Sequence, residues 1–538
     1  MGTQPLNRLR TDFPPLGLGA LVHRRITAPG ALAAVTLLLA IPASASSRSP
    51  GAPGIGDPYY PAYGNGGYDV SHYDLRLKYQ PATDRLDGTA TLLARTTQDL
   101  VRFNLDFLLD VSEVRVDGAK AAFRTSGEHE LEITPDKPLA KGTPVTVVVR
   151  YGGVPSKKQA YGFTSWLRTP DGGVAAGEPE AAWWWFPSND HPLDKATYDV
   201  SVQVPDGSQA ISNGTLQSAS SRAGWTRYSW RSDKPQATYL ATLAVGRFDI
   251  TTGTTKGGIP VLSAYSKDLG NVYGAARSSV ERTGEIADWL TGYFGPYPYN
   301  ALGGYVPNTG TGYALETQTR PYYSPRQFAA GSNTSVVVHE LAHQWYGDLV
   351  SVARWKDIWI NEGFARYAQW LWSEHEGEGT AQQLADHVYA SRPADDPFWK
   401  VAPGDPGPEN QFHLAVYDRG ALALQALRNR IGDADFFAVL KGWPAKYAHG
   451  NASVADFRRY AEQVSGKPLG GLFDTWLYRP SKPAADAARD ASIPVRAAGA
   501  KGTPVQPKSW KKIAATNGVH ERGHKRSGGR VAGGGHVE

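Results

Sequence analysis

The stretch that most constrains this chain is VVVHELAHQWYGD, from Val336 to Asp348. Its two histidines, His339 and His343, are four residues apart. On an α-helix they therefore lie roughly 40° apart around the axis, and both imidazoles can reach one metal ion. Glu340 completes the pattern His-Glu-x-x-His. A helix of this kind needs a third ligand from elsewhere in the chain and an open coordination position for water.

Glu362 is the candidate third ligand, because it follows His343 after 18 residues and opens a second helical segment, WINEGFARYAQWLW. The helix of His339 is preceded by several candidate N-caps and has no Gly or Pro between its histidines. The alternative is an ordinary buried helix whose histidines only make hydrogen bonds. The position of Glu362, 18 residues after His343, favours a metal site over this alternative. Asp348 and Asp357 are both candidates to orient a ligating histidine ring.

A second copy of the spacing, His520-Glu521-x-x-His524, lies near the C-terminus. Gly523 interrupts it, and no carboxylate follows at the spacing seen after His343. Glycine disfavours the helix that would bring the two rings together. We interpret this copy as part of a solvated tail, with adventitious metal capture as the alternative.

The absence of cysteine excludes disulfides, thiolate zinc sites, iron–sulfur clusters and thiol nucleophiles. Any metal must then be held by histidines and carboxylates. The net charge of +5 is unevenly divided, since residues 501–538 hold eight Lys or Arg and only two Glu. The body of the chain is mildly acidic, and no specific nucleic-acid binding is expected. The basic tail either contacts anionic cell-surface polymers through its charge or is a solubilising extension.

Residues 1–45 are typical of a signal peptide. Basic residues precede the apolar run Ala31–Ile41, and Ala43-Ser44-Ala45 offers a cleavage site. The run is shorter than the about 20 residues that a membrane span needs, although a retained anchor is the alternative. We therefore expect bacterial export, a secreted, extracellular protein, and no membrane span in the mature chain.

The remaining chain predicts a multidomain α+β protein. Residues 46–67 are rich in Gly, Pro and Ser and predict a linker. Residues 68–252 alternate apolar and polar positions, as in HYDLRLKY, and predict an antiparallel β domain. Residues 253–480 change to helical spacing and predict a mainly helical domain. Residues 481–538 lack apolar periodicity and predict a disordered basic tail.

The string HELAHQWYGD…WKDIWINEGFA resembles the gluzincin metallopeptidases of the aminopeptidase N and leukotriene hydrolase kind, peptidase family M1. The resemblance covers most of residues 63–480. It implies a saddle-like N-terminal β-sheet domain followed by a thermolysin-like zinc-peptidase domain. It also implies one zinc ion with His339, His343 and Glu362 as ligands, and Glu340 as the general base.

Three further segments carry the resemblance. VYDRGALALQALR resembles the start of the helix that bears the family's catalytic tyrosine, which implies that role for Tyr417. EPEAAWWWFPSND implies that Glu178 faces the free amine of a substrate. Glu316, in the segment YALET of Tyr313–Thr317, would bind the same ammonium group. An ordinary core or surface side chain is the alternative for Tyr417 and for Glu178.

Tyr313–Thr317 departs from the family's Gly-Ala-Met-Glu-Asn at three positions, which changes the backbone freedom and hydrogen bonding of this loop. The packed-looking sequence also stops near residue 480, without the family's large helical C-terminal domain. The leading hypothesis is a secreted zinc aminopeptidase that acts on peptides with a free N-terminus. The alternatives are a zinc metallopeptidase with relaxed or endopeptidase specificity, and a non-catalytic peptide-binding protein on the same fold.

Overall fold

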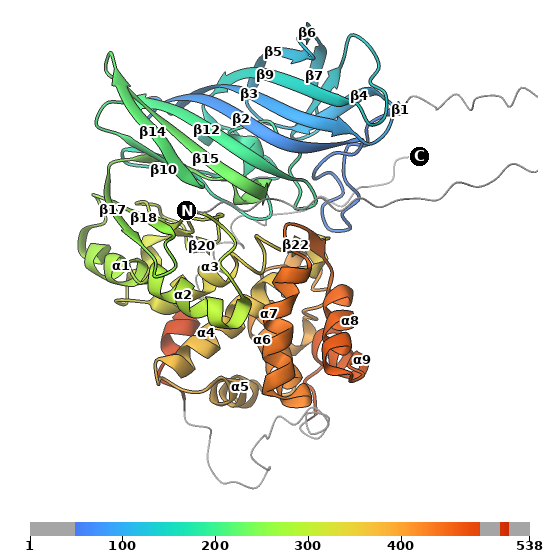
Figure 1. Ribbon diagram of the computed structural model, residues 1–538, viewed down its shortest axis with the longest axis vertical. Helices are drawn as coiled ribbons and strands as arrows, with labels where there is room; N and C mark the ends of the chain where they lie inside the picture. The colour runs from blue at the N-terminus through green and yellow to red at the C-terminus, as the bar shows by residue number, and fades with distance from the viewer. Residues whose placement is uncertain (1–48, 485–505, 516–538) are drawn as a thin grey trace, which may run out of the picture. The chain divides into compact units, whose positions relative to one another are not determined.

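The computed structural model describes residues 49–484 and 506–515. The predicted signal peptide, most of the predicted tail and the second His-Glu-x-x-His copy lie outside these described residues. One hydrophobic core forms among the strands and another among the helices. In Figure 1 the strands run from blue to green, and the helices that follow them run from green to orange. The predicted order, a β-sheet domain followed by a mainly helical domain, is confirmed.

The N-terminal domain is built on an eight-stranded sheet with the order β14-β15-β12-β2-β3-β9-β5-β6. Its strands are β2 (Tyr68–Gln80), β3 (Arg85–Thr96), β5 (Asp110–Val116), β6 (Ala119–Lys120), β9 (Pro144–Gly153), β12 (Lys195–Pro205), β14 (Thr215–Arg222) and β15 (Trp225–Ala237). Neighbouring strands are antiparallel except β12 and β2, which are parallel. The sheet thus differs from a purely antiparallel one at a single pairing.

Alternation along β2 decides which face of this sheet is buried. Four apolar or aromatic positions two residues apart are almost fully buried: Tyr73, Leu75, Leu77 and Tyr79. Successive side chains of a strand point to opposite faces, so the polar residues between them face outward. At the end of β5, Asp117 and Gly118 have φ of 49° and 82°. This left-handed pair is what a type I′ hairpin turn needs, and glycine adopts it without strain.

Two four-stranded sheets complete the domain, with the orders β1-β4-β8-β7 and β10-β11-β16-β13. Their strands are β1 (Ser49–Pro50), β4 (Leu100–Asp106), β7 (Ala122–Ser126), β8 (Glu130–Thr134), β10 (Trp166–Thr169), β11 (Gly172–Ala175), β13 (Gln209–Ser212) and β16 (Leu243–Gly246). Their buried Leu, Val, Phe and Trp side chains join the same core as the large sheet. Removing this apolar surface from water stabilises the sandwich of sheets.

The second domain opens with a five-stranded sheet, in the order β17-β18-β19-β21-β20. Its strands are β17 (Phe248–Thr254), β18 (Pro260–Ser266), β19 (Leu302–Val306), β20 (Ala314–Leu315) and β21 (Tyr322–Tyr323). Because β17 pairs along its whole length with β18, we assign it to the second domain, which then begins no later than Phe248. The change of hydrophobic period had predicted a boundary at 252.

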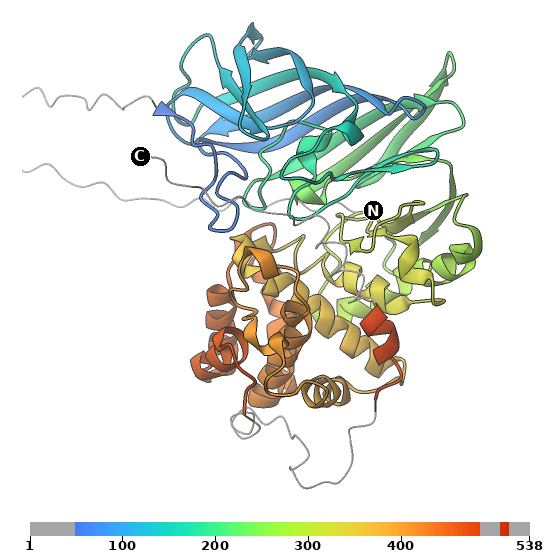
Figure 2. The same ribbon diagram turned by 180° about the vertical axis from the view of Figure 1, so that it is seen from behind.

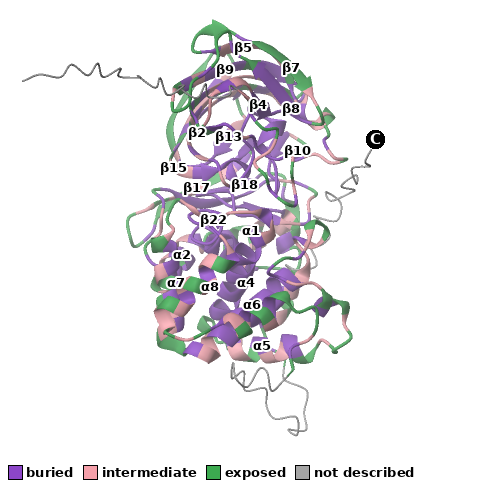
Figure 3. Ribbon diagram, turned by 90° about the vertical axis from the view of Figure 1, so that its right-hand side faces the viewer, coloured by how far each residue is buried: buried purple, intermediate pink, exposed green. Residues whose placement is uncertain are grey.

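Helices make up most of the remaining second domain. They are α1 (Tyr273–Val280), α2 (Thr283–Phe294), α3 (Thr334–Ala342), α4 (Trp359–His375), α5 (Ala381–Ala390), α6 (Leu414–Ile431), α7 (Asp433–Lys446), α8 (Val454–Ser465) and α9 (Gly470–Phe473). A short sheet of β22 (Ser351–Val352) and β23 (Asn451–Ala452) lies among them. Helix α4 is buried along most of its length, as its purple ribbon in Figure 3 shows, and it packs against α3 and α6. None of the helices in the described ranges has the length and apolarity of a membrane span.

Residues 51–67, within the predicted linker, form a packed segment that we name the N-terminal strap. The buried Asp57 accepts a hydrogen bond at 2.8 Å from the backbone N–H of Trp355. The Tyr60 hydroxyl donates to Gln411 Oε1 at 2.6 Å. Both partners belong to the second domain. The Gly, Pro and Ser residues that predicted a linker instead permit sharp turns within the strap. Its aromatic rings and the buried carboxylate of Asp57 anchor it.

Residues 506–515, inside the predicted disordered tail, also differ from the prediction. Residues 510–515 form a short helix, drawn in red in Figure 2. The Ile513 side chain is buried, Trp510 packs against the helical core, and the hydroxyl oxygens of Ser509 and Ser373 lie 2.7 Å apart. Two apolar anchors suffice to dock so short a segment, but they are too few to produce a periodic pattern.

Candidate metal and catalytic site

Helix α3 presents both histidines of the His-Glu-x-x-His pattern. Asn333 caps the helix by accepting a hydrogen bond at 3.1 Å from the backbone N–H of Ser335. The helix ends at Ala342, and His343 still has helical dihedral angles, with φ of −59° and ψ of −25°. The rings of His339 and His343 are buried, and their centroids are 4.8 Å apart. The four-residue spacing therefore places both rings on one face.

Helix α4 brings Glu362 to these rings. Its Oε2 lies 3.1 Å from His339 Nε2 and 3.5 Å from His343 Nε2. With ligand bonds of about 2.0–2.2 Å, two imidazole nitrogens and a carboxylate oxygen at these separations fit a tetrahedral zinc ion with one position open. Burial lowers the pKa of His339 to about 4, which keeps the ring neutral, as a ligand must be. The donor set therefore fits zinc.

Two glycines allow α4 and α6 to approach closely beside the site. A Cβ atom on Gly363 would lie 2.5 Å from Trp359 Nε1. One on Gly420 would lie 2.5 Å from Trp359 Cδ1 and 3.2 Å from Gly363 Cα. Tyr417 is one turn before Gly420 on α6, so the close approach of α4 and α6 places the Tyr417 ring near His339. The two ring centroids are 5.9 Å apart, with an interplanar angle of 23°.

The remaining nitrogen of each histidine is held by a neutral acceptor. His339 Nδ1 lies 3.2 Å from Gln369 Oε1, and His343 Nδ1 lies 3.0 Å from the backbone oxygen of Tyr346. The Gln369 amide is itself fixed, because its Nε2 donates to the Ser335 carbonyl at 3.0 Å. These bonds hold a proton on Nδ1, so that the neutral form of each ring presents its lone pair at Nε2.

Neither predicted aspartate orients a ligand histidine. Asp357 Oδ1 accepts a hydrogen bond from the Val454 backbone N–H at 3.0 Å. The Asp348 oxygens are buried and have no hydrogen-bond partner among the described residues. Gln369 was missed because a glutamine on a helix carries no distinctive signal. Its position two turns after Glu362 on α4 could have indicated it, since seven residues return to the same helix face.

Replacing Gln369 with Ala is expected to weaken zinc binding at this site by about 10- to 100-fold, because the ring of His339 loses its orienting acceptor. The zinc concentration that restores half of the peptidase activity to chelated protein measures the effect. Gln217→Ala, an exposed glutamine on β14, is the control. Equal zinc requirements for the two variants would show that Gln369 does not position the ring.

Glu340 lies beside the ligands without contacting them through a hydrogen bond. Its carboxyl is buried, and Oε1 has no hydrogen-bond partner among the described residues. Donor atoms of Glu316, Glu340 and His343 all lie within 4.8 Å of one another. Burial and the neighbouring carboxylates raise the pKa of Glu340, and His343 opposes the shift. A carboxyl group with raised proton affinity is suited to accept a proton and pass it on.

Glu316 and Glu178 bring two more carboxyl groups to this region. Glu316 follows the edge strand β20 and accepts a hydrogen bond from the Tyr239 hydroxyl at 3.2 Å. Glu178 is buried, and its Oε1 has no hydrogen-bond partner in the described chain. Burial, followed by the charge of Glu316, raises the pKa of Glu178. Neighbouring buried carboxyl groups destabilise the fold unless protons or cations neutralise them, so a metal ion and a substrate ammonium both fit.

The residues that depart from the family pattern tie down the loop of Glu316. The Tyr313 hydroxyl donates to the Ala176 carbonyl at 3.1 Å. The Thr317 hydroxyl donates to the Arg320 carbonyl at 2.6 Å. These bonds fix the loop on both sides of Glu316, so the departures do not leave it unsupported.

Tyr417 is placed to keep its hydroxyl as a hydrogen-bond donor. Burial and the carboxylate of Glu362 raise the pKa of Tyr417 well above its usual value. The Arg366 guanidinium lies 5.6 Å from the centre of its ring and pairs with Asp418 at 3.0 Å. The ring is therefore fixed between Arg366 and His339.

Tyr417→Phe is expected to lower kcat by about 10²–10³-fold, because the phenol is the donor that would meet negative charge developing on the substrate oxygen. The phenyl ring keeps the contact with His339, so zinc content and melting temperature should be unchanged. Steady-state kinetics of peptide cleavage measures the effect, with the exposed Tyr478→Phe as the control. A kcat within threefold of the wild type would remove Tyr417 from the catalytic groups.

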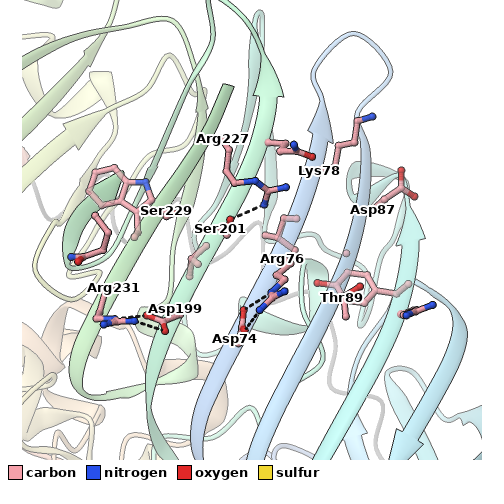
Figure 4. Close-up of a pocket in the computed structure, with 18 of the residues that line it drawn as sticks. Asp74, Arg76, Lys78, Asp87, Thr89, Asp199, Ser201, Arg227, Ser229 and Arg231 are labelled. Carbon is pink, nitrogen blue, oxygen red and sulfur yellow. Dashed lines mark hydrogen bonds and ion pairs between the residues drawn. The ribbon is translucent and has the colours of Figure 1, made fainter. Parts of the chain in front are cut away.

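A separate hollow of about 680 Å³ lies on the outward face of the eight-stranded sheet (Figure 4). Its charges are largely satisfied within the sheet. Arg76 pairs with Asp74 at 3.0 Å, and Arg231 pairs with Asp199 at 2.7 Å. None of the predicted site residues lines it. The chemistry predicted from the sequence therefore belongs to the buried site between α3, α4 and α6.

Comparison with known families agrees with this geometry. The family model "Peptidase M1 N-terminal domain" matches residues 70–240, and "Peptidase family M1 domain" matches residues 321–476. The site residues His339, His343, Glu362 and Tyr417 all fall within the second match.

Solved structures and curated relatives of the same family resemble the chain. An M1 zinc metallopeptidase variant from Deinococcus radiodurans, bound to a Tyr-Ser-Ala substrate, is 28% identical with a TM-score of 0.72, covering 80% of this chain and 99% of that one. Glutamyl aminopeptidase of Sus scrofa is 27% identical over 75% of this chain, and aminopeptidase M1-D of Oryza sativa subsp. japonica is 26% identical over 76%. The alignments span only 46% and 50% of these two relatives. The chain belongs to the M1 family of zinc metallopeptidases.

Proposed function

We propose that this chain is a zinc-dependent aminopeptidase that removes N-terminal residues from peptides. The observation that carries the proposal is the placement of two buried carboxyl groups, Glu316 and Glu178, beside a zinc-ligand set and a carboxyl base. A metal site alone would support peptide hydrolysis at any bond. The buried carboxyl groups of Glu316 and Glu178 can also bind the ammonium group of a free N-terminus. The aminopeptidase relatives give the proposal independent support.

His339, His343 and Glu362 would hold the zinc ion. When bound there, zinc supplies a Lewis acid that polarises a peptide carbonyl and makes water acidic enough to ionise near neutral pH. The neutral imidazoles and single carboxylate leave a net positive charge on the site, which the buried carboxyl groups nearby balance.

Glu340 moves the proton. It accepts a proton from the attacking water and returns it to the nitrogen of the leaving amine, for which its raised pKa suits it. The Tyr417 hydroxyl donates a hydrogen bond to the oxygen of the scissile carbonyl as negative charge develops there. Glu316 and Glu178 pair with the substrate ammonium and so fix the bond that is cut.

The direct test follows products of a ten-residue peptide by mass spectrometry, before and after chelation and after zinc is restored. Sequential loss of single N-terminal residues, abolished by chelation and recovered with zinc, supports the proposal. Internal fragments would support the relaxed or endopeptidase alternative. An absence of cleavage in zinc-loaded protein that still binds the peptide would support the peptide-binding alternative.

We further infer that the protein is exported and that its basic tail contacts anionic cell-surface polymers. The pattern of Arg residues, apolar run and Ala43-Ser44-Ala45 supports export, and the positive excess of residues 501–538 supports charge-driven contact. N-terminal sequencing of protein from the culture medium tests export, with a start near residue 46 expected. Cell-wall retention that persists in high salt would contradict an electrostatic contact.

A further inference from the structure

A second cluster of metal-ligating side chains lies in the N-terminal domain, formed by Asp106, His129 and Glu130. All three are buried, and their donor atoms lie within 4.8 Å of one another. Asp106 ends β4 and Glu130 begins β8, and these two residues are direct partners in the antiparallel pairing of the strands. His129 immediately precedes β8. The register of one strand pair therefore brings the three side chains together.

Three oxygen atoms surround a single nitrogen of His129. Nε2 lies 3.0 Å from the carbonyl oxygen of Ala62, 3.1 Å from Asp106 Oδ1 and 4.0 Å from Glu130 Oε1. One N–H can satisfy only one of these acceptors. If Nε2 instead carries a lone pair, the nitrogen and the three oxygens are four donors to one cation.

The carboxyl group of Glu130 indicates that the cluster binds a cation, because hydrogen bonds within the described chain do not satisfy its two oxygens. Its side chain is 9% exposed, and neither carboxyl oxygen has a hydrogen-bond partner among the described residues. The Asn104 amide influences this carboxyl group without making a hydrogen bond of normal geometry to it. Asp106 Oδ1 likewise has no hydrogen-bond partner of normal geometry in the described ranges. Two carboxylates buried in this way need either a cation or a proton to neutralise them.

The surrounding groups orient the cluster as supporting groups orient metal ligands. His129 Nδ1 lies 3.3 Å from the Tyr161 hydroxyl, and Asp106 Oδ2 accepts a hydrogen bond at 2.7 Å from the backbone N–H of Asp190. His129 and Asp106 thus each have one atom fixed from outside and the other directed inward. The ring of Trp183 covers His129, with centroids 3.9 Å apart, and shields the cluster from water.

The catalytic site of the same chain provides a scale for these distances. There, His339 Nε2 and Glu362 Oε2 are 3.1 Å apart, as His129 Nε2 and Asp106 Oδ1 are. In both places the second ring nitrogen faces a neutral oxygen acceptor. One imidazole with oxygen donors suits Zn²⁺ better than Ca²⁺, which prefers oxygen alone. Four protein donors would close the site to water, as in structural zinc sites.

We propose that Asp106, His129 and Glu130, together with the Ala62 carbonyl, bind a second zinc ion with a structural role. Ala62 belongs to the N-terminal strap, residues 51–67, whose Asp57 and Tyr60 contact the second domain. The ion joins this strap to the strand pair β4–β8. The chain then holds two zinc ions, one catalytic and one that fastens the strap.

The test counts zinc in purified, folded full-length protein by plasma mass spectrometry. Two equivalents per chain are expected for the wild type and one for the His339→Ala/His343→Ala double variant. Glu130→Gln is expected to retain one and to keep its peptidase activity. The matched control is Glu132→Gln, equally buried on β8 but paired with Arg102 and Arg124, and it should retain two. One equivalent in the wild type and none in the double variant would overturn the proposal.

Two further readouts apply to the double variant, so the result does not depend on Glu130→Gln folding. Zinc should raise its melting temperature by at least ~3 °C, as expected for an ion that binds only the folded state. A chelator should increase the rate of proteolytic cleavage within the strap at least tenfold. No change in melting temperature or cleavage would mean that protons, rather than a metal ion, neutralise the cluster, and would refute the second site.

Discussion

Glu340→Gln is expected to lower kcat by about 10³-fold while zinc content stays at the wild-type level. The amide keeps the size of the carboxyl group but cannot accept a proton, and general acid–base groups contribute about 10²–10⁴-fold. Within the described residues the Oε1 atom of Glu340 has no hydrogen-bond partner, so the substitution should leave the geometry of the metal ligands intact. Steady-state kinetics and metal analysis of the same preparation measure both quantities.

The control for this variant is Glu281→Gln, which removes an exposed carboxyl group paired with Arg277. Its kcat should equal that of the wild type, since surface ion pairs contribute little. Retention of more than a tenth of the wild-type kcat by Glu340→Gln would show that another group accepts the proton. Loss of zinc along with activity would show that Glu340 supports the metal site instead.

Glu316→Gln is expected to lower kcat/KM for peptides with a free N-terminus by at least ~30-fold. Removing one partner of a buried charge pair costs about 2–5 kcal/mol. The variant keeps the acceptor for the Tyr239 hydroxyl, because the amide oxygen can replace Oε1. Melting temperature should therefore stay close to that of the wild type.

The same variant separates amine recognition from peptide hydrolysis. Cleavage of an N-acetylated peptide, which has no ammonium group to lose, should be unchanged by Glu316→Gln. An equal fall for the free and acetylated peptides would place Glu316 in support of the metal site rather than in contact with the amine. Glu178→Gln should show the same selective loss.

Local patterns in the sequence predicted the parts of the fold that depend on local geometry. The period of two in β2 identified the buried face of Tyr73, Leu75, Leu77 and Tyr79, because side chains of a strand alternate whatever the strand pairs with. The spacing of His339 and His343 predicted a shared helix face for the same reason. Glu362 was found because family resemblance and spacing coincide.

Long-range packing explains what the sequence did not predict. The parallel pairing of β12 with β2 joins segments more than a hundred residues apart, and alternation within each strand does not choose a partner. The N-terminal strap was read as a linker because its Gly and Pro content is ordinary for one, whereas its anchors Trp355 and Gln411 lie almost 300 residues or more away.

The groups that orient the catalytic histidines, and the Asp106–His129–Glu130 cluster, were not predicted from the sequence for a related reason. Gln369 and Tyr346 act on the histidines through an amide and a backbone carbonyl, groups with no residue pattern of their own. Asp106 and His129 become neighbours only through the register of β4 with β8. Such contacts require the folded chain.

The measurement that tests the central claim most directly compares one peptide in two forms, free and N-acetylated, with the zinc-loaded wild-type enzyme. The account predicts release of the first residue from the free peptide and a kcat/KM at least ~30-fold lower for the acetylated one, because only the free form offers an ammonium to Glu316 and Glu178. Equal kcat/KM values for the two forms would contradict an aminopeptidase and leave a zinc peptidase that does not recognise the N-terminus.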